Sequence, residues 1–421
     1  MYEVVRNATV RSLANLVSRT RGTRAVRTVC IVALAAGSLW VTVGSSADAQ
    51  SQVSTIQDIV RAAMTRYHLK ALIVQVRSGG SDVYTNAFGE SMSGVPATAD
   101  MHFRNGAMAF TYMSTMLLEL VDQQKVTLDT KLSRFRPDLP YADRITLKNL
   151  ANMSSGYADY VYQPELLKGV GLDPFRQWTP QELIRIGVTK PMMFAPGTNW
   201  GYSHTNYAIL GGVLEKIAGM PLNDAMHKYI FGPMGLTQTD GFVTPHIPDP
   251  VLHSFSSERR QDLGVRPSVP FYEESTFWNP SWTTFDGAVQ TTNITDMSKS
   301  MEAVGTGSLL SPSSFAAQVD PNLVGFGHAD KKCAACRQNT TAFNYGMGVV
   351  IFGPWIAQDK SFFGCAATVG YLPAQKLTIA VAVTYLPEAF DAQGNYKDAS
   401  VSTFRTLVDA LAPNTMPNSK L

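Results

Sequence analysis

The chain has few of the residues that build metal centres and disulfide frameworks. Its 421 residues include four cysteines and seven histidines. One Cys-x-x-Cys pair, Cys333 and Cys336, is present, but no second pair and no His-x-x-x-His spacing completes a zinc site. The sequence therefore predicts no metal and no other cofactor. In an oxidising compartment it predicts a local disulfide between Cys333 and Cys336.

Charge is also scarce. Charged residues make up 16% of the chain, and the formal net charge is +2. This excess comes from the first 49 residues; without their six arginines and two acidic residues, 29 basic and 31 acidic residues remain. A slightly negative chain has no basic surface for nucleic acid or for an anionic membrane. We therefore expect no nucleic-acid partner.

Long apolar runs are absent apart from one, at residues 29–43. It follows an arginine-rich stretch and precedes Ala47-Asp48-Ala49, a small-x-small cleavage pattern. The pattern predicts a signal peptide over residues 1–49, cut after Ala49, and hence a secreted, periplasmic or cell-envelope protein. An uncleaved anchor is the alternative, although the run is shorter than the ~20 residues of a spanning helix. Membrane contact is expected only through this segment.

The rest of the chain has enough apolar residues for a full core, since 45% of the sequence is hydrophobic. Apolar spacing predicts helices at 55–67, 111–121, 180–186, 207–218 and 401–411, and strands at 71–76, 83–88, 346–352 and 377–384. We expect one domain over residues 50–415. Its terminal pieces, 50–104 and 336–415, form an α/β layer, and residues 105–335 form an inserted helical lobe.

Five segments carry motif-like patterns. They are Phe103 to Phe110, Ile145 to Gly156, Pro196 to Gly211, Gly287 to Asp296, and Tyr345-Gly346-Met347-Gly348 with Gly364 to Tyr371. In this order they resemble the serine β-lactamase and D-alanyl-D-alanine peptidase superfamily, particularly its class C β-lactamase and esterase branch. The resemblance covers residues 55–411. It implies an α+β fold in which N- and C-terminal helices flank an antiparallel sheet beside a helical lobe.

The resemblance also implies three catalytic motifs, and this chain departs from each. The Ser-x-x-Lys motif falls on Ala107 and Phe110, and no serine in the chain has a lysine three residues later. Tyr-x-Asn falls on Tyr202-Ser203-His204, and Lys/His-x-Gly falls on residues 365–367, which begin with Cys365. The chemistry needs an oxygen nucleophile with a basic or cationic nitrogen one helical turn later. A methyl group and a phenyl ring supply neither, so we expect no catalytic residues.

The degenerate positions still define a candidate ligand pocket, formed by Ala107, Tyr202, His204, Cys365 and Thr368. The resemblance implies that the backbone N–H groups of Ala107 and Thr368 hold a carbonyl or carboxylate oxygen. Tyr202 is either a retained proton shuttle or an aromatic lining residue. Cys365 is either a nucleophile beside His204 or a small buried hydrophobe.

Three classes of function remain open. The chain is an inactive exported member of the superfamily that binds a peptidoglycan-like peptide, a small carboxylate ligand or a partner; or a hydrolase or esterase with relocated chemistry; or a structural envelope protein. Relocated chemistry would use Cys365 or a serine such as Ser114, Ser154 or Ser203. We expect the first class. An open polar pocket favours the first two classes, and a pocket filled by Phe110 favours the third.

Overall fold

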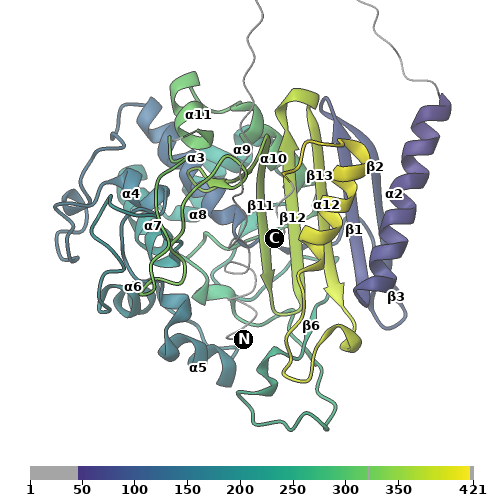
Figure 1. The fold of residues 1–421 in the computed structure, drawn as a ribbon. Helices are drawn as coiled ribbons and strands as arrows, with labels where there is room; N and C mark the ends of the chain where they lie inside the picture. Colours follow the sequence, from purple (N-terminus) through teal and green to yellow (C-terminus); the bar gives the residue numbers. More distant parts are fainter. Residues whose placement is uncertain (1–45, 321, 418–421) are drawn as a thin grey trace, which may run out of the picture.

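A computed structural model describes residues 46–320 and 322–417 and contains one large antiparallel sheet (Figure 1). Its strand order is β3-β2-β1-β13-β12-β11-β10-β9. The strands are β1 (Leu69–Ser78), β2 (Ser81–Met92), β3 (Val95–Pro96), β9 (Asn344–Tyr345), β10 (Val350–Phe352), β11 (Trp355–Phe362), β12 (Cys365–Leu372) and β13 (Leu377–Tyr385). The central pairing of β1 with β13 joins the two ends of the described chain. The expected α+β class with an antiparallel sheet is confirmed.

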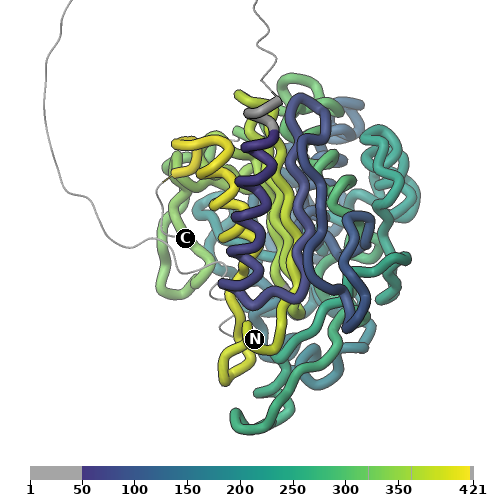
Figure 2. Tube along the Cα trace, turned by 90° about the vertical axis from the view of Figure 1, so that its right-hand side faces the viewer, coloured from purple at the N-terminus to yellow at the C-terminus, as the bar shows by residue number. Residues whose placement is uncertain are grey.

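The two terminal helices, α2 (Ser46–Arg66) and α12 (Ala399–Leu411), lie side by side on one face of the sheet (Figure 2). Each places an apolar stripe against the strands, as period-3.6 spacing requires. Val60 of α2 and Phe404 of α12 share a buried cluster with Val74 and Val381 of the sheet. This layer matches the flanking helices that the resemblance implies.

The other face of the sheet carries the helical lobe (Figure 1). Its helices are α3 (Met108–Asp122), α4 (Leu147–Ala151), α5 (Pro164–Leu172), α6 (Pro180–Val188), α7 (His204–Ala218), α8 (Leu222–Met226), α9 (Gly232–Met234), α10 (Ile294–Thr306) and α11 (Pro312–Val319). A three-stranded sheet of β4 (Phe103–Arg104), β8 (Gln290–Thr292) and β5 (Asp240–Gly241) leads into α3, and β6 (Phe255–Ser256) pairs with β7 (Glu273–Glu274). Almost every side chain of α3 is buried.

The strand expectations are wrong in one region. Of the single strand expected at 346–352, only residues 350–352 form a strand, β10; β9 ends before this range, and residues 346–349 between them are not strand. The next two strands, β11 and β12, were not expected. All eight residues of β12 are buried, so the strand lacks the alternation that marks a half-exposed strand. The absence of β11 and β12 from the predicted strands affects the candidate site, because the third motif was placed on residues of β12.

The predicted signal peptide lies almost wholly outside the described residues. Helix α2 begins at Ser46, and cleavage after Ala49 stays a prediction. Of the helices in the described ranges, none is long and apolar enough to cross a membrane.

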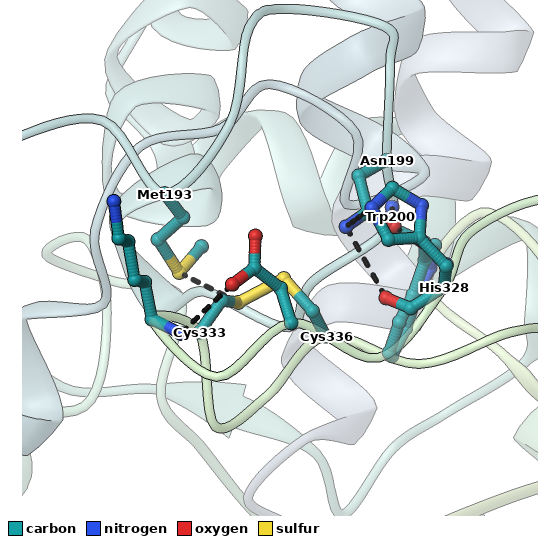
Figure 3. The surroundings of a disulfide bond; sticks show 8 residues. Met193, Asn199, Trp200, His328, Cys333 and Cys336 are labelled. Carbon is teal, nitrogen blue, oxygen red and sulfur yellow. Dashed lines mark hydrogen bonds between the residues drawn. A yellow bond between two sulfur atoms is a disulfide. The ribbon is translucent and has the colours of Figure 1, made fainter.

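Cys333 and Cys336 form a disulfide, as their spacing predicts (Figure 3). Cys333 Sγ contacts Met193 Sδ at 3.5 Å, and Cys336 forms a β-bridge with Gly201. The cross-linked turn therefore supports the backbone that enters Tyr202.

We expect the double substitution Cys333→Ser/Cys336→Ser to lower the free energy of unfolding by only about 2 kcal/mol, because the closed loop is short. Chemical denaturation of both proteins measures this difference. Thiol titration of the unreduced, denatured protein without its first 49 residues should find one thiol, from Cys365. Three thiols would contradict both the disulfide and the oxidising compartment.

Candidate functional site

Two residues before helix α3 stands a glycine whose replacement by a larger residue would strain the backbone and displace Lys360. Gly106 has φ +56°, and a Cβ there would lie 2.3 Å from Lys360 Cβ on β11. Ala107 caps the helix, and the Phe110 N–H donates to Ala107 O at 2.9 Å. The first turn therefore presents a methyl group and a phenyl ring at the Ser-x-x-Lys spacing.

The Phe110 ring is the centre of an aromatic cluster. It stacks on Tyr207, with centroids 4.0 Å apart and planes 13° apart. Its centroid lies 5.5 Å from that of His204 and 6.0 Å from that of Tyr202. Only 2% of Phe110 is exposed, whereas Ala107, Tyr202 and His204 are partly exposed. The structure thus brings together Ala107, Phe110, Tyr202 and His204, which we call the α3 site.

A buried carboxylate orients His204. Asp159 accepts from His204 Nδ1, with distances of 3.0 and 3.2 Å to its two oxygens, and is 4% exposed. The same carboxylate caps the 3-10 turn η2 (Tyr160–Tyr162) by accepting from the Val161 N–H at 3.0 Å. A carboxylate on Nδ1 fixes the ring and its tautomer, so Nε2 is the nitrogen able to accept a proton. Sequence analysis missed this pair, since 45 residues separate its members and no motif joins them.

Tyr202 is a hydrogen-bond donor at neutral pH. Burial raises the pKa of Tyr202 well above its ordinary value, and the carboxylates of Asp159 and Asp359 raise it further. A phenol with so high a pKa keeps its proton, which disfavours the role of general base.

The expectation that Cys365 and Thr368 belong to this pocket is wrong for both residues. They lie on β12, between β11 and β13, where the Thr368 amide is enclosed by neighbouring strands. The Thr368 hydroxyl is 2.8 Å from that of Ser400 on α12, so this side chain points to the sheet face opposite α3. Cys365 is buried and lines a separate cavity with Arg104 and Trp278.

The strand beside α3 is β11. Gln358 Nε2 donates to Gly348 O at 2.9 Å, and Thr111 Oγ1 of α3 donates to the same oxygen at 2.6 Å. The third motif of the resemblance must face the same side as the first. Residues 358–360 of β11 lie nearer to the first motif than residues 365–367 of β12, and Lys360 places a cationic residue next to Gly106.

The serines considered as relocated nucleophiles are all buried. Ser114 Oγ lies 2.7 Å from the Tyr207 hydroxyl, and Ser154 Oγ donates to Asn152 Oδ1 at 2.6 Å. Ser114, Ser154 and Ser203 are each at most 2% exposed. Across the described ranges, no group of three or more His, Cys, Asp or Glu residues could hold a metal ion.

We expect native Cys365 to react with iodoacetamide more slowly than a model thiol, because a cysteine that is 5% exposed is screened from the reagent. His204→Ala should leave the rate unchanged between pH 5 and 9, since the two side chains do not meet. Mass spectrometry of timed samples gives both rates. Fast labelling that slows in His204→Ala would support the alternative of a reactive Cys365 beside His204.

The free energy of unfolding should decrease as the pH rises, because Asp359 loses its proton in a buried position. Burial and then the neighbouring Asp398 carboxylate raise the pKa of Asp359 to about 7, against the opposing influence of Arg337. An unfolded aspartate has a pKa of about 3.9, so the contribution of the protonated form is complete below pH ~4 and is lost as the pH approaches 7.

Asp359→Asn removes this titration, so its melting temperature relative to wild type should be higher at pH 8 than at pH 5. The exposed Asp143→Asn is the control and should show no such change. Thermal denaturation at both pH values measures the effect. An equal Asp359→Asn difference at pH 5 and pH 8 would contradict the raised pKa.

Comparison with known proteins gives consistent matches over most of the chain. A family model described as Beta-lactamase matches residues 56–402. Penicillin-binding protein 4 of Amycolatopsis lactamdurans is 30% identical over 191 residues, 44% of this chain and 48% of the relative. Esterase EstB of Burkholderia gladioli is 27% identical over 213 residues, 47% and 54% of the two chains. This chain thus spans about half the length of these relatives.

A solved structure, D-amino acid amidase from Ochrobactrum anthropi complexed with D-phenylalanine, matches with a TM-score of 0.70 and 19% identity. The match covers 86% of this chain and 99% of the amidase. At this identity the likeness concerns the fold.

Proposed function

Since this chain belongs to the β-lactamase family, we propose that it is a family member without serine acyl-enzyme chemistry, which acts by binding a ligand with a carboxylate or carbonyl oxygen. The observation that carries the proposal is the first turn of α3, where Ala107 and the buried Phe110 stand at the positions at which the resemblance implies a nucleophile and its basic partner. The likeness to penicillin-binding proteins and the predicted signal peptide support a place in the cell envelope.

The α3 site keeps groups that can hold an oxygen ligand. In the described part of the chain, the Ala107 N–H has no hydrogen-bond acceptor. Tyr202 offers a phenolic donor, and His204 is held in place by Asp159. Phe110 fills the inner side of the site, which by itself favours the structural class. The binding proposal therefore depends on the partly exposed rim formed by Ala107, Tyr202 and His204. This arrangement supports binding more than acyl transfer.

The ligand class follows from the family. The amidase with the same fold is named for D-amino acids and is complexed with D-phenylalanine in one structure and with L-phenylalanine in another. Other relatives are named for penicillin binding. We therefore propose D-amino acids and short peptides ending in them, as in peptidoglycan-like peptides, as the carboxylate ligands.

The test is a titration of the purified protein with D-phenylalanine and with D-alanyl-D-alanine, followed by isothermal calorimetry. We expect saturable binding that His204→Ala weakens at least tenfold, the equivalent of about 1.4 kcal/mol. The exposed His246→Ala is the matched control and should bind like wild type. Absence of binding to both probes, or binding that His204→Ala leaves intact, would refute the proposal and favour a structural envelope role.

The Asp159/His204 pair favours a second candidate, an esterase or amidase that activates water directly. Nε2 of an imidazole oriented by a carboxylate can remove a proton from water without a serine. Hydrolysis of p-nitrophenyl acetate and of D-phenylalanine amide tests this function. A rate above buffer that falls in both His204→Ala and Asp159→Asn would establish it, and a rate equal to buffer would exclude it.

A further inference from the structure

A second candidate site surrounds the side chain of Arg104. Arg104 is 5% exposed and belongs to β4, three residues before Ala107. Nη2 donates to Pro245 O at 2.6 Å. Nη1 is buried and has no hydrogen-bond partner within the described residues. An unpaired buried guanidinium nitrogen is unfavourable by itself, so its surroundings should contain a group that compensates it.

Those surroundings are a small cavity of about 20 Å³ lined by Arg104 and ten other residues, all buried. The polar lining comprises Arg104, Lys360, Ser254, Ser275, Thr276 and Cys365, and the remaining residues are apolar or aromatic. The lining contains two basic residues and no aspartate or glutamate. The volume suits one small occupant.

Lys360 interacts electrostatically with the Asp398 carboxylate, so the charge that concerns this cavity is that of Arg104. Burial lowers the pKa of Arg104 to about 10, and the Cys365 sulfur is the group that opposes this effect. Among the described residues, no ion pair joins Arg104 to a carboxylate. The protein itself therefore supplies no carboxylate counter-ion for this guanidinium.

We propose that the cavity beside Arg104 binds a small monovalent anion, of the size of chloride or formate, which accepts a hydrogen bond from Arg104 Nη1. Ser254, Ser275 and Thr276 line the same space. The Ser275 hydroxyl donates to Phe363 O and the Thr276 hydroxyl to Ser254 O, so Arg104 Nη1 is the main donor for an anion. The lining contains none of the four residues of the α3 site, and the proposal does not depend on the proposed function.

The first experiment follows the melting temperature of the full-length protein in sodium chloride, sodium formate and sodium gluconate at equal ionic strength. Gluconate is too large for the cavity. We expect chloride or formate to raise the melting temperature above gluconate by at least about 2 °C, along a saturating curve. Comparison of the chloride and formate curves shows which of these two anions binds better. Equal melting temperatures in all three salts would mean that the cavity holds water only and would overturn the proposal.

The second experiment uses Arg104→Met, which removes the charge but keeps much of the side-chain length. We expect the variant to lose the chloride and formate response. Arg260→Met is the matched control, because Arg260 is also buried but donates Nη1 and Nη2 to the carbonyls of Arg266 and Val269. It should keep the response. A response that survives in Arg104→Met would overturn the proposal.

A crystal of the wild-type protein soaked in bromide keeps the proposal testable if Arg104→Met does not fold. We expect an anomalous peak within hydrogen-bond distance of Arg104 Nη1, with Cys365→Ser giving the same peak. No peak at Arg104 in a crystal that shows bromide elsewhere would count against the anion site.

Discussion

Phe110→Ala is expected to lower the free energy of unfolding by about 3–5 kcal/mol, the range for truncating a buried phenylalanine. The ring is 2% exposed and stacks on Tyr207 with centroids 4.0 Å apart. Its removal leaves a cavity among Tyr202, His204 and Tyr207, which are held by other contacts and can fill it only in part. Urea denaturation of wild type and variant measures the difference.

The matched control is Phe175→Ala, because Phe175 is 62% exposed. It should change the free energy of unfolding by no more than about 0.5 kcal/mol. A Phe110→Ala loss as small as that of Phe175→Ala would show that the Phe110 ring does not support the α3 site. The account of Phe110 as the closed inner wall of the site would then be wrong.

Ala107→Ser is expected to leave hydrolysis of a chromogenic cephalosporin at the buffer rate. The new hydroxyl would have Phe110 one turn away, where proton removal needs a base, and general acid–base assistance is typically worth about 10²–10⁴ in rate. Tyr202 cannot replace that base, because its raised pKa keeps the phenol protonated. Initial rates at several protein concentrations measure the effect.

The comparison variant is Ala107→Ser/Phe110→Lys, which introduces both a hydroxyl nucleophile and a basic nitrogen. It is the smallest set of substitutions from which we expect any turnover. A charged amine beside Tyr207 should also destabilise the protein, since Phe110 is buried. Both variants are therefore assayed after their folding has been checked by circular dichroism. Turnover by folded Ala107→Ser above the buffer rate would contradict the need for a base at position 110.

Much of the fold could be predicted from the sequence, because the terminal helices carry apolar stripes and the central strands are runs rich in aliphatic and β-branched residues. The apolar stripes at 55–67 and 401–411 correspond to α2 and α12, and the runs at 71–76 and 377–384 to β1 and β13. Strand β12 could not be predicted in this way. Like β13 it is buried on both faces, but its first half is Cys-Ala-Ala-Thr, largely small residues without strong strand propensity.

The candidate site was predictable where it depends on one helix and not where it depends on tertiary contacts. The spacing of Ala107 and Phe110 on α3 follows from helix geometry alone. The stacking of Phe110 on Tyr207 and the pairing of His204 with Asp159 join distant segments, and no periodicity connects them. The placement of Cys365 failed for a related reason, since the sequence did not reveal that β11 lies between β12 and β10.

The most direct test of the central claim, that this family member forms no serine acyl-enzyme, is intact mass spectrometry of the wild-type protein after incubation with a reactive penicillin. Ala107 has no oxygen to acylate, so the account predicts an unchanged mass at all incubation times. A stoichiometric increase equal to the mass of the penicillin, removed by hydroxylamine, would contradict the claim and reveal a nucleophile elsewhere in the chain.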